Sequence, residues 1–202
     1  MTQSADIGNL PNLLTLSRIL LIPLFVIVYA IPGEATYIYA AGLFALAAFT
    51  DWLDGYLARR LNQTTAFGAF LDPVADKLIV VTALVVLIAH HHTAWLTFPG
   101  LIIVGREIVI SALREWMAEM NRRGVVAASW LGRVKTVFQM VAVVVLLANP
   151  PVFDRPWVLI GYGLIYIAAI MTLVSMVLYL KAAWPSLVDG MRDQNSDDSR
   201  SA

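Results

Sequence analysis

The sequence predicts an all-α polytopic membrane protein with six transmembrane helices, and three observations lead to this fold class. Apolar residues make up 59% of the 202 residues, charged residues only 14%, and the mean hydropathy is +0.74. A soluble domain typically carries about 25% charged residues, so this composition excludes a disordered chain and most soluble enzymes. The apolar residues also gather in long stretches, and helix-breaking or polar residues separate these stretches.

Each apolar stretch has roughly the 20 residues that a helix needs to cross the hydrocarbon core of a bilayer. The stretches cover residues 13–30, 36–60, 69–90, 95–120, 130–149 and 157–181. The segments between them contain Pro and Gly, as in Ile31-Pro-Gly-Glu34 and Asn149-Pro-Pro151, which end helices. No basic segment precedes the first stretch, so we expect it to be a retained span and not a cleaved signal.

We expect one membrane domain over residues 1–185, in which residues 1–12 lie along the membrane surface. Residues 186–202 are polar and are predicted to form a disordered tail. The loops after the first, third and fifth spans hold only Arg155 among the 14 basic residues, so both termini are predicted to face the cytoplasm. The net charge of zero gives no reason to expect a nucleic-acid partner.

Four aspartates interrupt the second and third apolar stretches: Asp51, Asp54, Asp72 and Asp76. A charge inside a span costs at least a few kcal/mol and marks a candidate functional site. At about 100° per residue, the members of the first pair lie about 60° apart on their helix, and those of the second pair about 40° apart. A short turn makes the two helices antiparallel, so the pairs are expected to face each other near the cytoplasmic end.

Facing carboxylates repel each other and cannot all ionise without cations nearby. Arg59 and Lys77 could neutralise part of this charge, but carboxylate oxygens are also the ligands that hard divalent ions prefer. Such oxygens suit Mg²⁺, Ca²⁺ or Mn²⁺, of which we expect Mg²⁺ or Mn²⁺. Two ions held by shared carboxylates would stabilise both the attacking and the leaving oxygen of a phosphoryl displacement. Small residues beside the aspartates, Gly55, Ala58 and Gly68, would let a bulky ligand approach the backbone.

The spacing of these residues matches a known signature. The chain reads Asp51-Trp-Leu-Asp54-Gly55-Tyr-Leu-Ala58-Arg59, then eight residues, then Gly68-Ala-Phe-Leu-Asp72-Pro-Val-Ala-Asp76. This motif resembles the signature of the CDP-alcohol phosphatidyltransferase family, D-x2-D-G-x2-A-R-x8-G-x3-D-x3-D, with every fixed position present. The resemblance also covers Asn9–Arg18, Gly105–Trp116 and Val134–Thr136, and it ends at about residue 185.

The resemblance implies a six-helix membrane enzyme with the CDP-alcohol phosphatidyltransferase fold, usually a homodimer. It further implies that the protein lies in the inner membrane of a bacterium and that its site faces the cytoplasm. Such an enzyme transfers a phosphatidyl group from CDP-diacylglycerol to an alcohol and releases CMP. It implies that Asp51, Asp54 and Asp72 are metal ligands. Asp76 is the expected general base and a further metal contact. We expect CDP-diacylglycerol to be bound by the motif residues Gly55, Ala58, Arg59 and Gly68.

The acceptor is expected to bind to basic residues of the fourth and fifth spans, namely Arg106, Arg114 and Lys135. Basic groups near a carboxylate site suit an acceptor that carries its own phosphate, and the segments around them are similar to the family branch that uses glycerol 3-phosphate. Serine or inositol phosphate as acceptor, and an ion or proton transporter with intramembrane carboxylates, are the alternatives.

These basic residues have simpler interpretations as well. Arg114 and Lys135 could anchor helix ends at the cytoplasmic surface, and Arg106 could pair with Glu107. Arg18, inside the first span, could line the site or extend its head group to the membrane interface.

Overall fold

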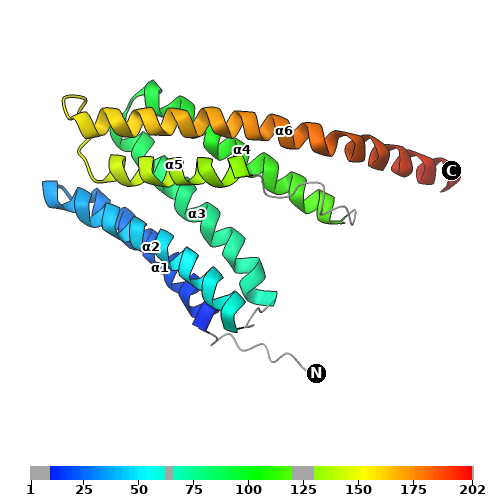
Figure 1. The fold of residues 1–202 in the computed structure, drawn as a ribbon, viewed down its shortest axis with the longest axis horizontal. Coiled ribbons are helices and arrows are strands. Elements are labelled where there is room, and N and C mark those ends of the chain that lie inside the picture. Colours follow the sequence, from blue (N-terminus) through cyan, green and yellow to red (C-terminus); the bar gives the residue numbers. More distant parts are fainter. Residues whose placement is uncertain (1–9, 62–65, 120–129, 202) are drawn as a thin grey trace.

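The computed structural model describes residues 10–61, 66–119 and 130–201. All its elements are α-helices, as the sequence predicts (Figure 1). The helices are α1 Leu10–Ala30, α2 Glu34–Leu61, α3 Ala66–His91, α4 Ala94–Glu119, α5 Trp130–Leu147 and α6 Pro156–Ser201. Each of the six predicted stretches coincides with one of these helices to within a few residues, except at the end of α6.

Helix ends follow the residues that cannot continue a helix. α1 ends at Ala30, and Gly33 then turns the chain with a φ of 153°, a conformation that glycine adopts most readily. Glu34 opens α2, where a negative charge interacts favourably with the helix dipole. α5 ends at Leu147, shortly before Pro150 and Pro151.

The C-terminal segment differs from the prediction of a disordered tail. α6 continues through Pro185 to Ser201, so residues 186–201 are helical. Extending an existing helix adds one hydrogen bond per residue without a new nucleation step, and hydrophobicity patterns do not report this effect. The proposed domain boundary at residue 185 stays a prediction.

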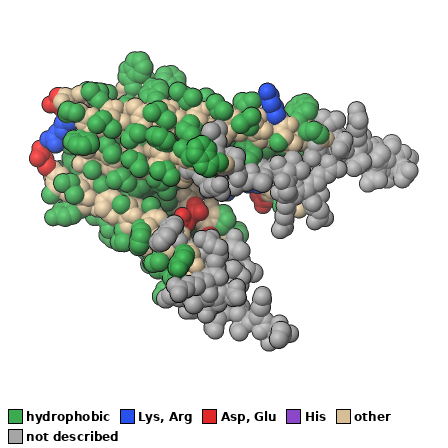
Figure 2. All heavy atoms as spheres, in the orientation of Figure 1, with side chains coloured by type: hydrophobic (Ala, Val, Ile, Leu, Met, Phe, Trp, Pro, Cys, Tyr) green, Lys and Arg blue, Asp and Glu red, His purple; other side chains and the backbone are tan. Residues whose placement is uncertain are grey.

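Three helices contain a window long and apolar enough to cross a membrane: Leu13–Ala30 in α1, Ala94–Ala118 in α4 and Pro156–Pro185 in α6. α5 has a shorter apolar segment, Val134–Leu147. Large apolar side chains cover the outside of the bundle (Figure 2). A soluble monomer rarely exposes such a continuous apolar surface, so these features are those of an integral membrane protein.

The helices form two groups that separate toward one end (Figure 1). α1 packs against α2 and α3, whereas α6 packs against α4 and α5, and α2 and α3 connect the groups through α4 and α5. The main core, with Phe25, Phe44, Leu84, Leu146 and Ile165, draws on all six helices. A second apolar cluster joins only α4 and α6. The groups are therefore held together at the end that contains the main core.

Candidate active site

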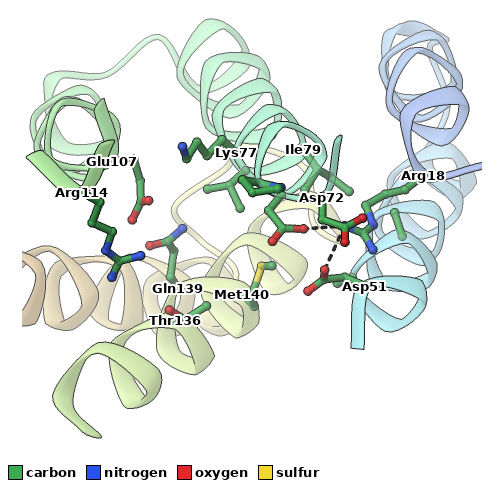
Figure 3. Close-up of a pocket in the computed structure, with 15 residues that line it drawn as sticks. Arg18, Asp51, Asp72, Lys77, Ile79, Glu107, Arg114, Thr136, Gln139 and Met140 are labelled. Atoms are coloured by element: carbon green, nitrogen blue, oxygen red, sulfur yellow. Dashed lines mark hydrogen bonds and ion pairs between the residues drawn. The ribbon is translucent and has the colours of Figure 1, made fainter. Parts of the chain in front are cut away.

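A cavity of about 370 Å³ lies between the two groups of helices, and all but α6 contribute residues to its lining. One side carries Arg18, Asp51 and Asp72, and the opposite side carries Glu107 and Arg114 (Figure 3). Figure 2 shows acidic side chains in the hollow where the two groups of helices diverge. The predicted carboxylate site and the predicted acceptor site thus face one another across one cavity.

The acidic side of the cavity is assembled from three helices. Nη1 of Arg18 lies 2.9 Å from Oδ1 of Asp51 and 2.5 Å from Oδ1 of Asp76. The hydroxyl of Thr15 donates a hydrogen bond of 2.6 Å to Oδ1 of Asp72. The side chains of Asp51 and Asp76 are 41% and 47% exposed, so both carboxylates remain accessible from the cavity that they line.

The register of α1 explains why Arg18 points into this site. The buried face of α1 contains Thr15, Arg18, Ile22, Phe25 and Tyr29, which follow the spacing of three and four residues that defines one helix face. Arg18 is 0% exposed and therefore does not extend to the membrane interface. Of its two interpretations, the structure supports the one in which it lines the site.

Part of the signature lies outside what the structure describes. Asp54, Gly55, Ala58 and Arg59 belong to α2, but their side chains are not among the described ones. Gly68 is buried near the start of α3. The roles of these residues as metal ligand or as CDP-diacylglycerol contacts stay predictions.

The opposite side of the cavity centres on Glu107 of α4. Oε1 of Glu107 accepts hydrogen bonds of 3.0 Å from Nη1 of Arg106 and 3.0 Å from Nζ of Lys135 on α5. Both cations are buried, and Glu107 itself is 26% exposed and lines the cavity. The expected pairing of Arg106 with Glu107 is therefore observed, and the predicted role of Arg106 and Lys135 in acceptor binding is not excluded by it.

Arg114 lies further along α4 and also lines the cavity. The guanidinium groups of Arg114 and Arg106 lie 5.8 Å and 5.6 Å from the ring centroid of Tyr179 on α6, within the range of a cation–π interaction. Nη2 of Arg106 also lies 3.4 Å from the hydroxyl of Ser175. Residues of α6 therefore contact and position these two arginines.

Several of these polar contacts were not predicted from the sequence. Thr15 lies three residues before Arg18, so the helical spacing of α1 was a signal that could have identified it. Tyr179 and Ser175 lie in an apolar stretch of α6, and no local pattern points from them to Arg106. Finding them requires the packing of α4 against α6.

The residues present fit a divalent ion by their chemistry. Asp51, Asp72 and Asp76 offer carboxylate oxygens on one cavity, and such oxygens suit Mg²⁺ and Mn²⁺. Oxygens of Asp51 and Asp76 converge on one nitrogen of Arg18, so these two carboxylates share one positive partner. Among the described side chains, which do not include Asp54, no three acidic or histidine groups come together as a complete metal site.

Comparisons with known proteins agree with the signature. A family model described as CDP-alcohol phosphatidyltransferase matches residues 8–180. A Pseudomonas fluorescens protein named CDP-diacylglycerol–glycerol-3-phosphate 3-phosphatidyltransferase is 55% identical over 195 residues, which cover 95% of this chain and 99% of that protein. Proteins of the same name from Escherichia coli strain K12 and Shigella flexneri are 52% identical over 182 residues, covering 90% of this chain and 98% of theirs. Since the match extends from the aspartate signature across nearly all of the membrane domain, the chain belongs to the CDP-alcohol phosphatidyltransferase family.

Proposed function

We propose that this protein transfers the phosphatidyl group of CDP-diacylglycerol to sn-glycerol 3-phosphate, giving phosphatidylglycerophosphate and CMP. The name shared by relatives that are 52–55% identical over at least 90% of the chain supports this activity. The single structural observation that carries it is the pairing of a carboxylate-lined wall with a basic wall across one cavity. One wall suits cations and the other suits the phosphate that glycerol 3-phosphate carries and serine lacks.

The carboxylate wall is proposed to hold divalent ions. Asp51, Asp54 and Asp72 would hold two divalent ions, either Mg²⁺ or Mn²⁺. Asp76 would lie next to these ions as a further contact. When bound, such ions supply charge neutralisation at the phosphoryl oxygens. Gly55, Ala58, Arg59 and Gly68 are proposed to bind CDP-diacylglycerol, because small residues permit close approach and an arginine suits a phosphate.

The basic wall is proposed to bind the phosphate of the acceptor. Arg114 lines the cavity and is the residue we expect to contact this phosphate first. Lys135 and Arg106 share one carboxylate, that of Glu107, so the two cations together retain excess positive charge. A charge-assisted hydrogen bond from any of the three would hold the acceptor more strongly than a neutral one.

The proposed reaction is a single displacement at phosphorus. The hydroxyl of glycerol 3-phosphate forms a bond to the β-phosphorus of CDP-diacylglycerol, the bond from that phosphorus to the CMP oxygen breaks, and Asp76 takes the hydroxyl proton. Asp76 is half-exposed and lines the cavity, so its carboxylate is accessible to a bound hydroxyl. Direct attack requires no protein nucleophile.

The proposed location is the bacterial cytoplasmic membrane, with the cavity open to the cytoplasm. The distribution of basic residues along the chain supports this orientation. A homodimer is also proposed, from the resemblance to the family. The apolar outer faces of the helices would contact membrane lipids.

An acceptor panel tests the proposed function. The full-length protein in detergent, with Mg²⁺ or Mn²⁺ and CDP-diacylglycerol, should release CMP rapidly with glycerol 3-phosphate and slowly with serine, inositol phosphate or no acceptor. Equal release with serine would assign a different acceptor. Release at the full rate without any acceptor would contradict direct displacement and favour a covalent intermediate.

A further inference from the structure

Arg18 lines the cavity, and the proposed reaction gives it no role. It is among the largest fully buried side chains of the protein. One nitrogen, Nη1, contacts carboxylates from two other helices, Asp51 of α2 and Asp76 of α3. Figure 3 shows this side chain between the acidic groups. It therefore occupies the space where the carboxylates converge.

The contacts of Arg18 have an electrostatic reason. A guanidinium remains charged at any accessible pH, and burying it is costly unless carboxylates compensate its charge. Conversely, Asp51, Asp72 and Asp76 lie on one cavity, where like charges disfavour each other. The arginine and the aspartates thus stabilise one another.

A divalent ion would bind the carboxylates of the same aspartates. A cation that binds between Asp51 and Asp76 would lie next to the guanidinium of Arg18, which contacts both carboxylates, so the two positive charges repel each other. We propose, on the basis of the metal-dependent function above, that Arg18 is a tethered counter-ion of the aspartate cluster. It balances the carboxylates when no divalent ion is bound, and it competes with the ion for them.

This proposal has a consequence that a purely structural role does not have. Under this proposal the ion weakens the Arg18 contacts, so these contacts favour the protein without the ion and lower the apparent affinity for it. Removing the charge of Arg18 should destabilise the ion-free protein and at the same time tighten metal binding. Activity should fall, because Asp76 loses the group that positions it.

The experiment compares full-length variants in detergent, each with excess EDTA and with saturating MnCl₂. For Arg18→Gln, we expect the apparent Kd for Mn²⁺ to fall roughly tenfold, since losing one competing charged contact has about this effect. The gain in melting temperature on adding MnCl₂ should exceed that of the wild type by roughly 3–6 °C. Unchanged or weaker Mn²⁺ binding, with an equal loss of melting temperature in both buffers, would overturn the proposal.

Arg106→Gln is the matched control. Arg106 is also a buried arginine with an acidic partner, but that partner is Glu107 on the opposite wall. Its replacement should lower the melting temperature by similar amounts in EDTA and in MnCl₂, with the Mn²⁺ affinity unchanged. Arg18→Lys keeps the charge and should keep the metal response of the wild type, and a response like that of Arg18→Gln would contradict the proposal.

A double variant covers the case in which Arg18→Gln does not fold. Arg18→Gln with Asp76→Asn removes one charge of each sign, so its melting temperature in EDTA should exceed that of the single variant. A double variant no more stable than Arg18→Gln would overturn the proposal. The wild-type acceptor panel is independent of these measurements: its failure would refute the transferase reaction, whereas the melting and Mn²⁺ data report on Arg18.

Discussion

On each of the two walls of the cavity, charged side chains of one sign are paired with a single residue of the opposite sign, and the signs are reversed between the walls. On the acidic wall, one buried cation, Arg18, contacts the carboxylates of Asp51 and Asp76. On the basic wall, one carboxylate, that of Glu107, contacts the cations Arg106 and Lys135. Each wall keeps an excess of one charge after its internal pairing. The comparison teaches that internal pairing can leave an excess of negative charge on one wall of a cavity and of positive charge on the other.

Substitutions on the acidic wall should reduce activity more than substitutions on the basic wall. Asp51→Asn and Asp72→Asn keep the size of the side chain but remove the charge that would hold a divalent ion, so each variant should lose activity by orders of magnitude. Excess chelator should abolish the activity of the wild type. CMP release in the acceptor assay measures both effects, and circular dichroism checks that the variants remain helical. Full activity in excess chelator would refute the metal assignment of this wall.

Substitution of Asp76 should lower the rate of the chemical step without weakening substrate binding. Asp76→Asn removes the expected proton acceptor, so kcat should fall by about a hundred- to ten-thousandfold, whereas CDP-diacylglycerol binding should change little. Steady-state kinetics together with equilibrium binding of CDP-diacylglycerol distinguish the two effects. If the variant instead loses Mn²⁺ binding, Asp76 is chiefly a ligand and another group takes the proton.

The basic wall should affect one substrate only. Lys135→Ala and Arg114→Ala each remove a charge-assisted hydrogen bond worth about 1.5–3 kcal/mol, which corresponds to a loss of about one to two decades in kcat/KM for glycerol 3-phosphate. The KM for CDP-diacylglycerol should remain near the wild-type value. Equal losses in kcat/KM for both substrates would mean that the basic wall does not bind glycerol 3-phosphate alone.

An ion pair outside the cavity should have the smallest effect. Nη2 of Arg155 lies 3.5 Å from Oε1 of Glu34, and both side chains are exposed. Such surface pairs contribute about 0–1 kcal/mol, so Arg155→Ala should leave activity unchanged and shift the melting temperature by a few degrees at most. A large loss of activity in this variant would show that charge effects in this protein extend beyond the two walls.

The sequence was sufficient to predict the six helices and the shared face of Asp72 and Asp76, because both follow from local periodicity. It was not sufficient to pair Arg18 with Asp51 and Asp76, since that contact depends on how α1 packs against α2 and α3. The partner of Lys135 was missed for the same reason. Lys135 reaches Glu107 of α4 from α5, and the two helices are brought together by packing against α6.

Arg106 is an instructive intermediate case. It precedes Glu107 directly, and adjacent residues of a helix do not normally face each other, yet the long arginine side chain reaches the glutamate. Its contacts with Ser175 and Tyr179 depend on α6 and have no local signal. The helical continuation of α6 to Ser201 has no signal in the polar composition of this segment, because composition indicates burial and a helix can continue without being buried.

The divergence of the two groups of helices also affects whether the acyl chains of a bound lipid have to leave the bilayer. A cavity at the end where α1–α3 separate from α4–α6 can receive a head group while the acyl chains stay beside the apolar outer faces of the helices. Extracting a chain from the bilayer costs about 0.8 kcal/mol for each CH₂ group, so withdrawing two long chains would exceed the binding free energy of any small site. For the proposed reaction, the divergence of the helices would let the head group of CDP-diacylglycerol enter the cavity while its acyl chains remain in the bilayer.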